Sequence, residues 1–248
     1  DGLADRSHQS LDWRTPLQAA PTPNLDRLAR DGACGYFHAL SPGLPLSSEA
    51  AHFFLMGYGP EHFPGRGYLE ALGFGLDLQP GDVALLAHLA MFRPEDSRLS
   101  LLERKPRLAE DLATELFAAA GDYSGSQGAA SLRRTKGSSG ILILRGAGLS
   151  RRITDSDPLI NGQPLLKPLP WADHEDDLRA RRTAGLLSSY LIHAHQVLDQ
   201  HPLNLARAEQ GLAPVNCVIT QRAGQATDLE PVGLRWGLKV LSLSSAPI

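Results

Sequence analysis

Apolar residues recur along the chain in two alternating patterns, short uninterrupted runs and longer stretches at helical spacing. The runs from Val83 to Phe92 and from Val215 to Ile219 have the length of buried strands. The stretch from Arg107 to Ala120 repeats its large apolar residues every three or four positions, which predicts an amphipathic helix. The same pattern from Asp176 to Asp199 predicts the longest helix of the chain. Short strands that alternate with helices of this kind predict an α/β fold.

Three further segments carry predictions of their own. The segment from Gly121 to Gly140 is rich in glycine, serine and alanine, so we expect a mobile surface loop there. The segment from Gly237 to Leu243 is expected to form another strand. The segment from Pro23 to Gly32 predicts a helix that turns Leu25 and Leu28 toward the core and ends at its glycine in a left-handed conformation.

The stretch from Pro45 to Pro60 holds the first candidate for chemistry. Pro45 stops any preceding regular structure and an apolar run follows, so we expect a buried helix that begins near Ser47 and Ser48. Backbone N–H groups and the positive end of the helix dipole would favour a phosphate on the Ser48 hydroxyl. His52 lies one turn further on the same face. A plain N-cap serine and a structural histidine remain the alternative, and the local pattern favours it.

Composition and charge exclude several classes of partner. The net charge is -3 and the isoelectric point is near 6.3, which gives no reason to expect nucleic acid or an anionic membrane. No apolar run approaches the roughly 20 residues of a membrane-spanning helix. The chain has two cysteines, Cys34 and Cys217, in unrelated surroundings, which fits a reducing cytoplasm. The composition does not indicate an oligomeric state.

Charged residues beside turn formers mark two further candidate anion sites. Arg66 stands between two glycines, which would leave its guanidinium room to meet a phosphate or carboxylate with two hydrogen bonds. Residues 145 to 158, RGAGLSRRITDSDP, bring Arg145, Asp155 and Asp157 into one loop. Such a loop can bind an anionic metabolite, whereas mutual salt bridges on a wet surface are the default explanation.

Several motifs, taken in order, resemble one protein family. They extend over nearly the whole chain: DGLADR, TPNLDRLARDG, SPGLPLSSEAAHFFLMGYGP, GRGYLEALG, LQPGDVA, LRGAGLSRRITDSDP, HPLNLARAEQGLAP and the segment that ends in QRAG. The chain resembles the cofactor-independent phosphoglycerate mutases of the archaeal type, in the alkaline phosphatase superfamily.

The resemblance implies an enzyme that moves a phosphoryl group between the hydroxyls of 2-phosphoglycerate and 3-phosphoglycerate through a phosphoserine. Its partner would be this small phosphorylated hydroxy acid, and its cofactors two divalent cations, Mn, Mg or Zn. Ser48 would be both nucleophile and metal ligand, and Asp1 a second metal ligand. A cation would help because a serine hydroxyl is a poor nucleophile until its proton is removed. The residues implied along the substrate path are His52, Arg66, Arg145, Asp155 and Asp157.

The resemblance also implies a domain organisation. Residues 1 to 80 and 213 to 248 would belong to an alkaline-phosphatase-like metal-binding core, which is incomplete in this chain. Residues 81 to 212 would form an inserted α/β cap domain that grips the substrate.

Four positions depart from the family pattern. Glu49 stands where an aspartate usually follows the nucleophile, and Leu86 and His88 stand where the cap strand carries arginine and asparagine. Gln221 replaces a usual arginine. These changes leave open a different hydroxy acid, homoserine among them, as the substrate of a phosphotransferase or phosphomonoesterase.

The family pattern continues beyond the position that matches Ile248 with an Asp-x-x-x-His pair, an Asp-His pair and a further histidine. We therefore expect the chain to be a fragment, short at both ends and inactive by itself. A non-catalytic homologue that binds an anionic metabolite is the alternative from another functional class.

Overall fold

The computed structural model describes residues 5–35, 38, 47–95 and 98–241. The chain divides into two compact units, residues 1–60 and residues 61–248. The division into a metal-binding core and an inserted cap, drawn from the resemblance, stays a prediction.

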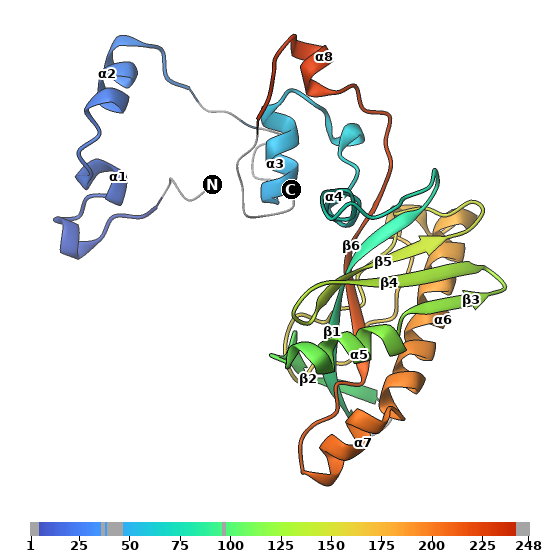
Figure 1. The fold of residues 1–248 in the computed structure, drawn as a ribbon. Coiled ribbons are helices and arrows are strands. Elements are labelled where there is room, and N and C mark those ends of the chain that lie inside the picture. The colour runs from blue at the N-terminus through green and yellow to red at the C-terminus, as the bar shows by residue number, and fades with distance from the viewer. Residues whose placement is uncertain (1–4, 36–37, 39–46, 96–97, 242–248) are drawn as a thin grey trace. The chain divides into compact units, whose positions relative to one another are not determined.

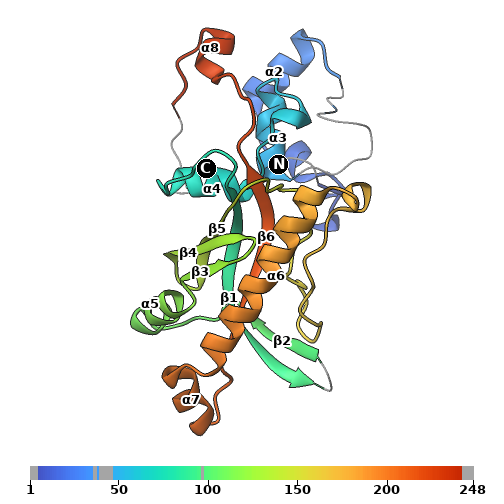
Figure 2. The ribbon, with the colours of Figure 1, turned by 90° about the vertical axis from the view of Figure 1, so that its right-hand side faces the viewer.

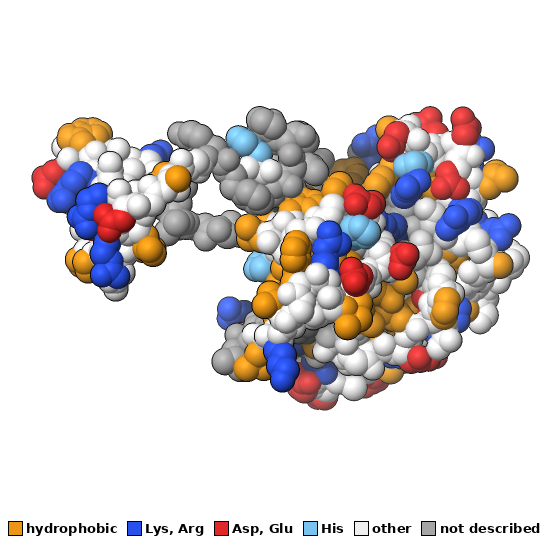
Figure 3. Space-filling model, turned by 90° about the horizontal axis from the view of Figure 1, so that it is seen from above, with side chains coloured by type: hydrophobic (Ala, Val, Ile, Leu, Met, Phe, Trp, Pro, Cys, Tyr) orange, Lys and Arg blue, Asp and Glu red, His pale blue; other side chains and the backbone are white. Residues whose placement is uncertain are grey.

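The described part of residues 1–60 is helical. After a single 3-10 turn at Gln9–Leu11 come three helices: α1 (Pro16–Ala19), α2 (Pro23–Asp31) and α3 (Ser48–Leu55). The prediction of α2 is confirmed, but Leu25 and Leu28 are 55% and 67% exposed instead of buried. Gly32 is extended, with φ -107, instead of left-handed. Hydrophobic side chains accordingly show at the surface of the helical segment drawn at the left in Figure 3.

Residues 61–248 are built on one curled sheet, and all pairings among its described strands are antiparallel. The strand order is β2-β1-β5-β4-β3, and β6 also pairs with β1. The strands are β1 (Val83–Glu95), β2 (Arg98–Arg104), β3 (Asp122–Gly125), β4 (Gly128–Lys136), β5 (Ser139–Arg145) and β6 (Cys217–Gln225). The predicted strands at residues 83–92 and 215–219 are thus confirmed in kind, and β1 is the strand that joins the two halves of the sheet.

Helices cover both faces of β1, as the alternation of its side chains requires. Leu85 and its alternate neighbours pack under α5 (Glu110–Ala119) and α6 (Leu178–Asp199), where the Tyr190 hydroxyl donates to the Ala120 carbonyl at 2.9 Å. Leu86 points the other way, toward Ala71 of α4 (Arg66–Gly73). The ribbon shows α6 running along the sheet and α4 near its end (Figure 1, Figure 2). A mixed α/β fold was predicted and is confirmed.

The expectation of a mobile loop at residues 121–140 is wrong. The segment forms β3 and β4, and β4 pairs with β5 from Ala129 to Lys136. Ala130 and Leu132 alternate toward the core and are buried. The small residues have low intrinsic strand propensity, which is why a loop was expected. Tertiary contacts stabilise the strands instead: β4 pairs with β5, and α5 covers them.

The last described segment contains α7 (Pro202–Glu209) and α8 (Val232–Trp236). The strand expected at Gly237–Leu243 is absent from its described portion, residues 237–241, which carries no regular structure, and residues 242–243 lie outside the described part. None of the helices in the described ranges is long and apolar enough to cross a membrane.

Candidate functional site

The N-terminus of α3 presents the predicted nucleophile. Ser47 is the N-cap, and its side chain accepts a hydrogen bond from the Ala50 N–H at 3.4 Å. Ser48 is therefore the first helical residue, and it is exposed. The capping role that the sequence left open between the two serines belongs to Ser47. The Ser48 hydroxyl thus stands beside the N–H groups of the first turn, at the positive end of the helix dipole.

His52 lies one turn further along α3. Its Nδ1 is 2.6 Å from the backbone oxygen of Ser48. Because a carbonyl oxygen can only accept, Nδ1 carries the proton, and in the neutral ring Nε2 is left as the acceptor. The contact holds the imidazole on the Ser48 side of the helix, the face that the spacing of four residues predicted.

The described residues do not fit a divalent metal centre. No group of three or more histidine, cysteine, aspartate or glutamate side chains within the described ranges could hold an ion. Asp1, the second implied metal ligand, lies outside the described residues.

Arg66 opens α4 and is already paired within the chain. Its Nε donates to the Glu70 carboxylate at 2.6 Å, one turn along the helix. The flanking glycines serve the backbone: Gly65 has φ +91, and a Cβ on Gly67 would lie 2.2 Å from the Ala84 carbonyl oxygen. Of the two glycines that suggested space for an anion, Gly67 therefore lets α4 lie against β1, and Gly65 lies against the Ala223 carbonyl of β6.

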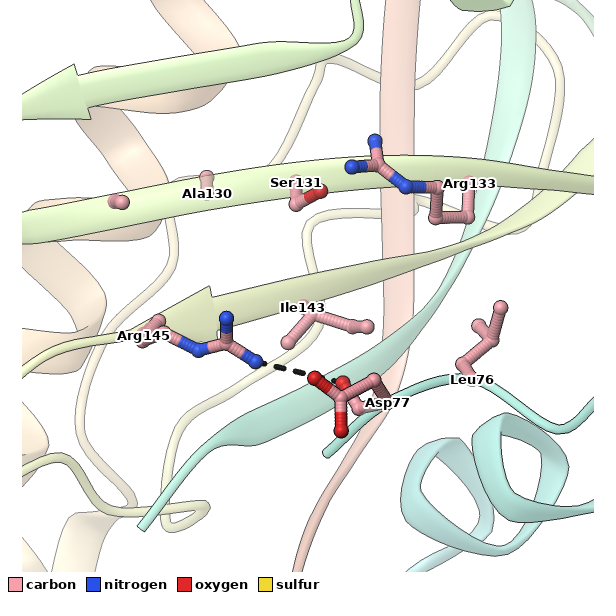
Figure 4. Close-up of a pocket in the computed structure, with 8 residues that line it drawn as sticks. Leu76, Asp77, Ala130, Ser131, Arg133, Ile143 and Arg145 are labelled. Atoms are coloured by element: carbon pink, nitrogen blue, oxygen red, sulfur yellow. Dashed lines mark hydrogen bonds between the residues drawn. The ribbon is translucent and has the colours of Figure 1, made fainter. Parts of the chain in front are cut away.

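Arg145, at the end of β5, forms a bidentate pair with a buried carboxylate. Its Nε and Nη2 donate to Asp82, the closest contact being 2.7 Å, and Asp82 has 2% of its side chain exposed. These hydrogen bonds raise the pKa of Arg145. Figure 4 shows Arg145 and Arg133 on two sides of a cavity of about 220 Å³, with Ser131 and Ile143 between them and the backbone of Asp77 hydrogen-bonded to Arg145.

Asp155 and Asp157 are held in one loop by different partners. Asp155 accepts the Arg222 backbone N–H at 2.7 Å, and burial raises the pKa of the Asp155 carboxyl against that hydrogen bond. Asp157 has no exposed side-chain surface and receives two nitrogens of Arg104, at 2.9 Å from Nε and 2.5 Å from Nη2. This pair is a mutual salt bridge, which the sequence offered as the alternative to binding of an anionic metabolite.

The six predicted site residues that the structure describes fall in both units. Ser48 and His52 belong to residues 1–60, and the other four belong to residues 61–248. Each of the predicted arginines, Arg66 and Arg145, carries a carboxylate partner of its own. Sequence reasoning missed Asp82 as the partner of Arg145 and Arg104 as the partner of Asp157, because these two pairs span 63 and 53 residues.

Comparison with known proteins identifies the relatives. Residues 29–204 match the family model for 2,3-bisphosphoglycerate-independent phosphoglycerate mutase. A protein of that name from Methanopyrus kandleri is 38% identical over 100% of this chain and 59% of its own length. Another from Archaeoglobus fulgidus is 34% identical over 100% of this chain and 60% of its own length.

Solved structures show the same architecture. A cofactor-independent phosphoglycerate mutase from Thermoplasma acidophilum aligns with a TM-score of 0.60 and 32% identity over 99% of this chain and 63% of that one. A Pyrococcus horikoshii protein aligns with a TM-score of 0.66 and 26% identity over 100% of this chain and 56% of that one. The fold is thus the α/β fold of cofactor-independent phosphoglycerate mutases. The chain belongs to the 2,3-bisphosphoglycerate-independent phosphoglycerate mutase family and spans 59% of the length of the Methanopyrus kandleri relative.

Proposed function

We propose that the whole protein interconverts 2-phosphoglycerate and 3-phosphoglycerate through a phosphoserine on Ser48. Membership of the mutase family supports the reaction. Its partner would be this small phosphorylated hydroxy acid, and its compartment the cytoplasm. The remaining site residues, His52, Arg66, Arg145, Asp155 and Asp157, stay assigned to the substrate path as part of the proposal.

The position of Ser48 carries the proposal. Ser48 is exposed at the first residue of α3, at the positive end of the helix dipole. That end of the dipole would stabilise the negative charge of a phosphoryl group on Ser48. His52, held by its Nδ1 on the Ser48 carbonyl, has Nε2 as the atom able to accept a proton.

The proposal includes two divalent cations, Mn, Mg or Zn, bound by Asp1, Ser48 and further ligands. The described residues do not form that centre, so most of its ligands would lie outside them. The division into a core of residues 1–80 with 213–248 and a cap of residues 81–212 is proposed on the same resemblance.

Labelling of the serine tests the proposal. The whole protein is incubated with phosphate-labelled 3-phosphoglycerate and manganese, quenched in acid, and mapped by mass spectrometry. We expect the label on Ser48 in the wild type and in Ser47→Ala, which removes only the helix cap. Label or full turnover in Ser48→Ala would overturn the phosphoserine.

A related hydroxy acid is the second candidate for the substrate. It is favoured by β1, where the buried Leu86 and His88 stand in place of the arginine and asparagine of the family pattern. Comparing turnover of phosphoglycerate with that of phosphohomoserine by the whole protein separates the two. Turnover of phosphohomoserine alone would establish the second candidate.

A further inference from the structure

His88 of β1 holds a buried polar atom without a partner. The residue is 5% exposed, and its Nδ1 is 3.1 Å from the Ser139 hydroxyl. Nε2 is the one buried side-chain nitrogen or oxygen among the described residues that has no hydrogen bond. An orphaned buried group of this kind costs free energy, so its persistence calls for an explanation such as a ligand.

The imidazole is neutral and can present Nε2 as a donor. Burial lowers the pKa of His88 to about 3, and the charges of Lys105, Arg104 and Arg66 lower it in the same direction. The Ser139 hydroxyl can donate to Nδ1 as well as accept from it. When the hydroxyl donates, the ring proton sits on Nε2, which then offers an N–H to an acceptor.

Lys105 is the cation of this neighbourhood that has no counter-ion. Among the described residues, no carboxylate lies within ion-pair distance of its ammonium, whereas Arg66 pairs with Glu70 and Arg104 with Asp157. Its backbone is left-handed, with φ 52, a conformation that costs a lysine free energy and often marks a functional position. Loss of hydration lowers the pKa of Lys105, and the charge of Arg104 lowers it further.

The charged groups that act on His88, together with the carboxylates paired to them, therefore add up to one net positive charge. The Arg66 and Arg104 pairs are each neutral overall, and Lys105 is the remainder. Leu86, two residues before His88 on the same face of β1, is apolar and 6% exposed. The Lys105 backbone N–H donates to the carbonyl of Leu89, the residue after His88, at 3.2 Å. One uncompensated cation near a neutral N–H donor matches a group with a single negative charge.

We propose that His88 Nε2 and the Lys105 ammonium together bind one carboxylate of a small hydroxy acid, in preference to a doubly charged phosphate. That this carboxylate belongs to the substrate rests on the proposed function. His88 thereby determines specificity, since it supplies a neutral donor and adds no second positive charge to that of Lys105. Access to Nε2 requires a side-chain movement, and Lys105 is the neighbour that no ion pair holds.

Titration of the whole protein, with no phosphorylated substrate present, tests the site without turnover. D-glycerate and inorganic phosphate are added separately at constant ionic strength, and the histidine ring resonances are followed by NMR. The His88 signals are assigned by their loss in His88→Gln. We expect D-glycerate to shift them saturably, and phosphate to shift them only at higher concentration.

Matched lysine variants identify the cation. Lys105→Met should weaken D-glycerate binding at least about tenfold, because a charge-assisted hydrogen bond is lost. Lys167→Met removes an exposed lysine and should leave binding within about twofold of the wild type. Unchanged melting curves for both variants ensure that binding, not folding, is compared.

Three outcomes would overturn the proposal: no shift of the His88 signals, tighter binding of phosphate than of D-glycerate, or equal binding by the two lysine variants. Each leaves the labelling of Ser48 unaffected, so the proposed function can stand while the site fails. Conversely, D-glycerate binding that depends on Lys105, in a protein that takes no label on Ser48, would support the site and contradict the mechanism.

Discussion

The Arg104 guanidinium donates hydrogen bonds from two nitrogens to the buried carboxylate of Asp157, at 2.9 and 2.5 Å. The pair joins the end of β2 to the loop at residues 152–158, and the same carboxylate accepts the Leu159 N–H at 2.8 Å. Asp157 was predicted from the sequence as a substrate-binding residue. Within the chain it acts as an anchor, and the pair leaves Lys105 next to it without a counter-ion.

Breaking this pair should destabilise the fold. Arg104→Met leaves the Asp157 charge buried without its cationic partner, so we expect the free energy of unfolding to fall by about 3 to 5 kcal/mol. The exposed pair of Arg93 and Glu95 gives the control, and Arg93→Met should cost less than about 1 kcal/mol. Urea denaturation followed by circular dichroism measures both. Equal small losses would show that the buried pair contributes no more than a surface one.

The contact of α4 with β1 should not tolerate a methyl group. Gly67→Ala would place its Cβ 2.2 Å from the Ala84 carbonyl oxygen, so the helix or the strand must move. We expect a loss of about 1 to 3 kcal/mol in the free energy of unfolding. Gly35→Ala, where nothing lies within 4 Å of the added atom, should change it by less than about 0.5 kcal/mol. A fully stable Gly67→Ala protein would contradict the packing.

The neutrality of His88 predicts a pH dependence. Its pKa is lowered to about 3 in the folded protein, below the ordinary value of 6.5, so the unfolded chain binds a proton that the folded chain does not. Stability is therefore greatest above pH 6.5 and falls as the pH drops toward 3, by about 1.4 kcal/mol per unit at most.

Comparison with His88→Gln isolates this contribution, because glutamine does not titrate. The raised pKa of Asp155 acts in the opposite direction at low pH, and it is common to both proteins. Urea midpoints between pH 7 and 4.5 should fall more steeply for the wild type than for the variant. Parallel curves would mean that His88 gains its proton in the folded state as readily as in the unfolded state.

The hydroxyl of Tyr190 should contribute to the core beneath α6. Tyr190→Phe leaves the Ala120 carbonyl without its donor in a buried environment, so we expect a loss of about 1 to 3 kcal/mol. Tyr123 is half-buried and its hydroxyl makes no hydrogen bond within the described structure, so Tyr123→Phe is the matched control. Thermal unfolding of the two variants should separate them, and identical melting temperatures would contradict the hydrogen bond.

The sequence by itself determined whether a segment is helix or strand wherever its apolar residues follow one clear pattern. The apolar run of β1 and the helical spacing of α5 and α6 each depend on which side chains face one core, so local pattern was enough. The collinear motifs were enough for the family. The sequence also placed Ser48 at the start of a helix, because Pro45 stops any preceding regular structure and an apolar run of helical character follows.

Only the tertiary structure decided what lies between those elements. The small residues of β3 and β4 form strands because β5 offers them hydrogen bonds and α5 covers them. The partners of Arg145 and Asp157 are Asp82 and Arg104, far along the chain, and spacing does not encode such pairs. His88 likewise looked like one departure from a pattern, until the fold buried its Nε2 without a hydrogen bond among the described residues, near the charge of Lys105.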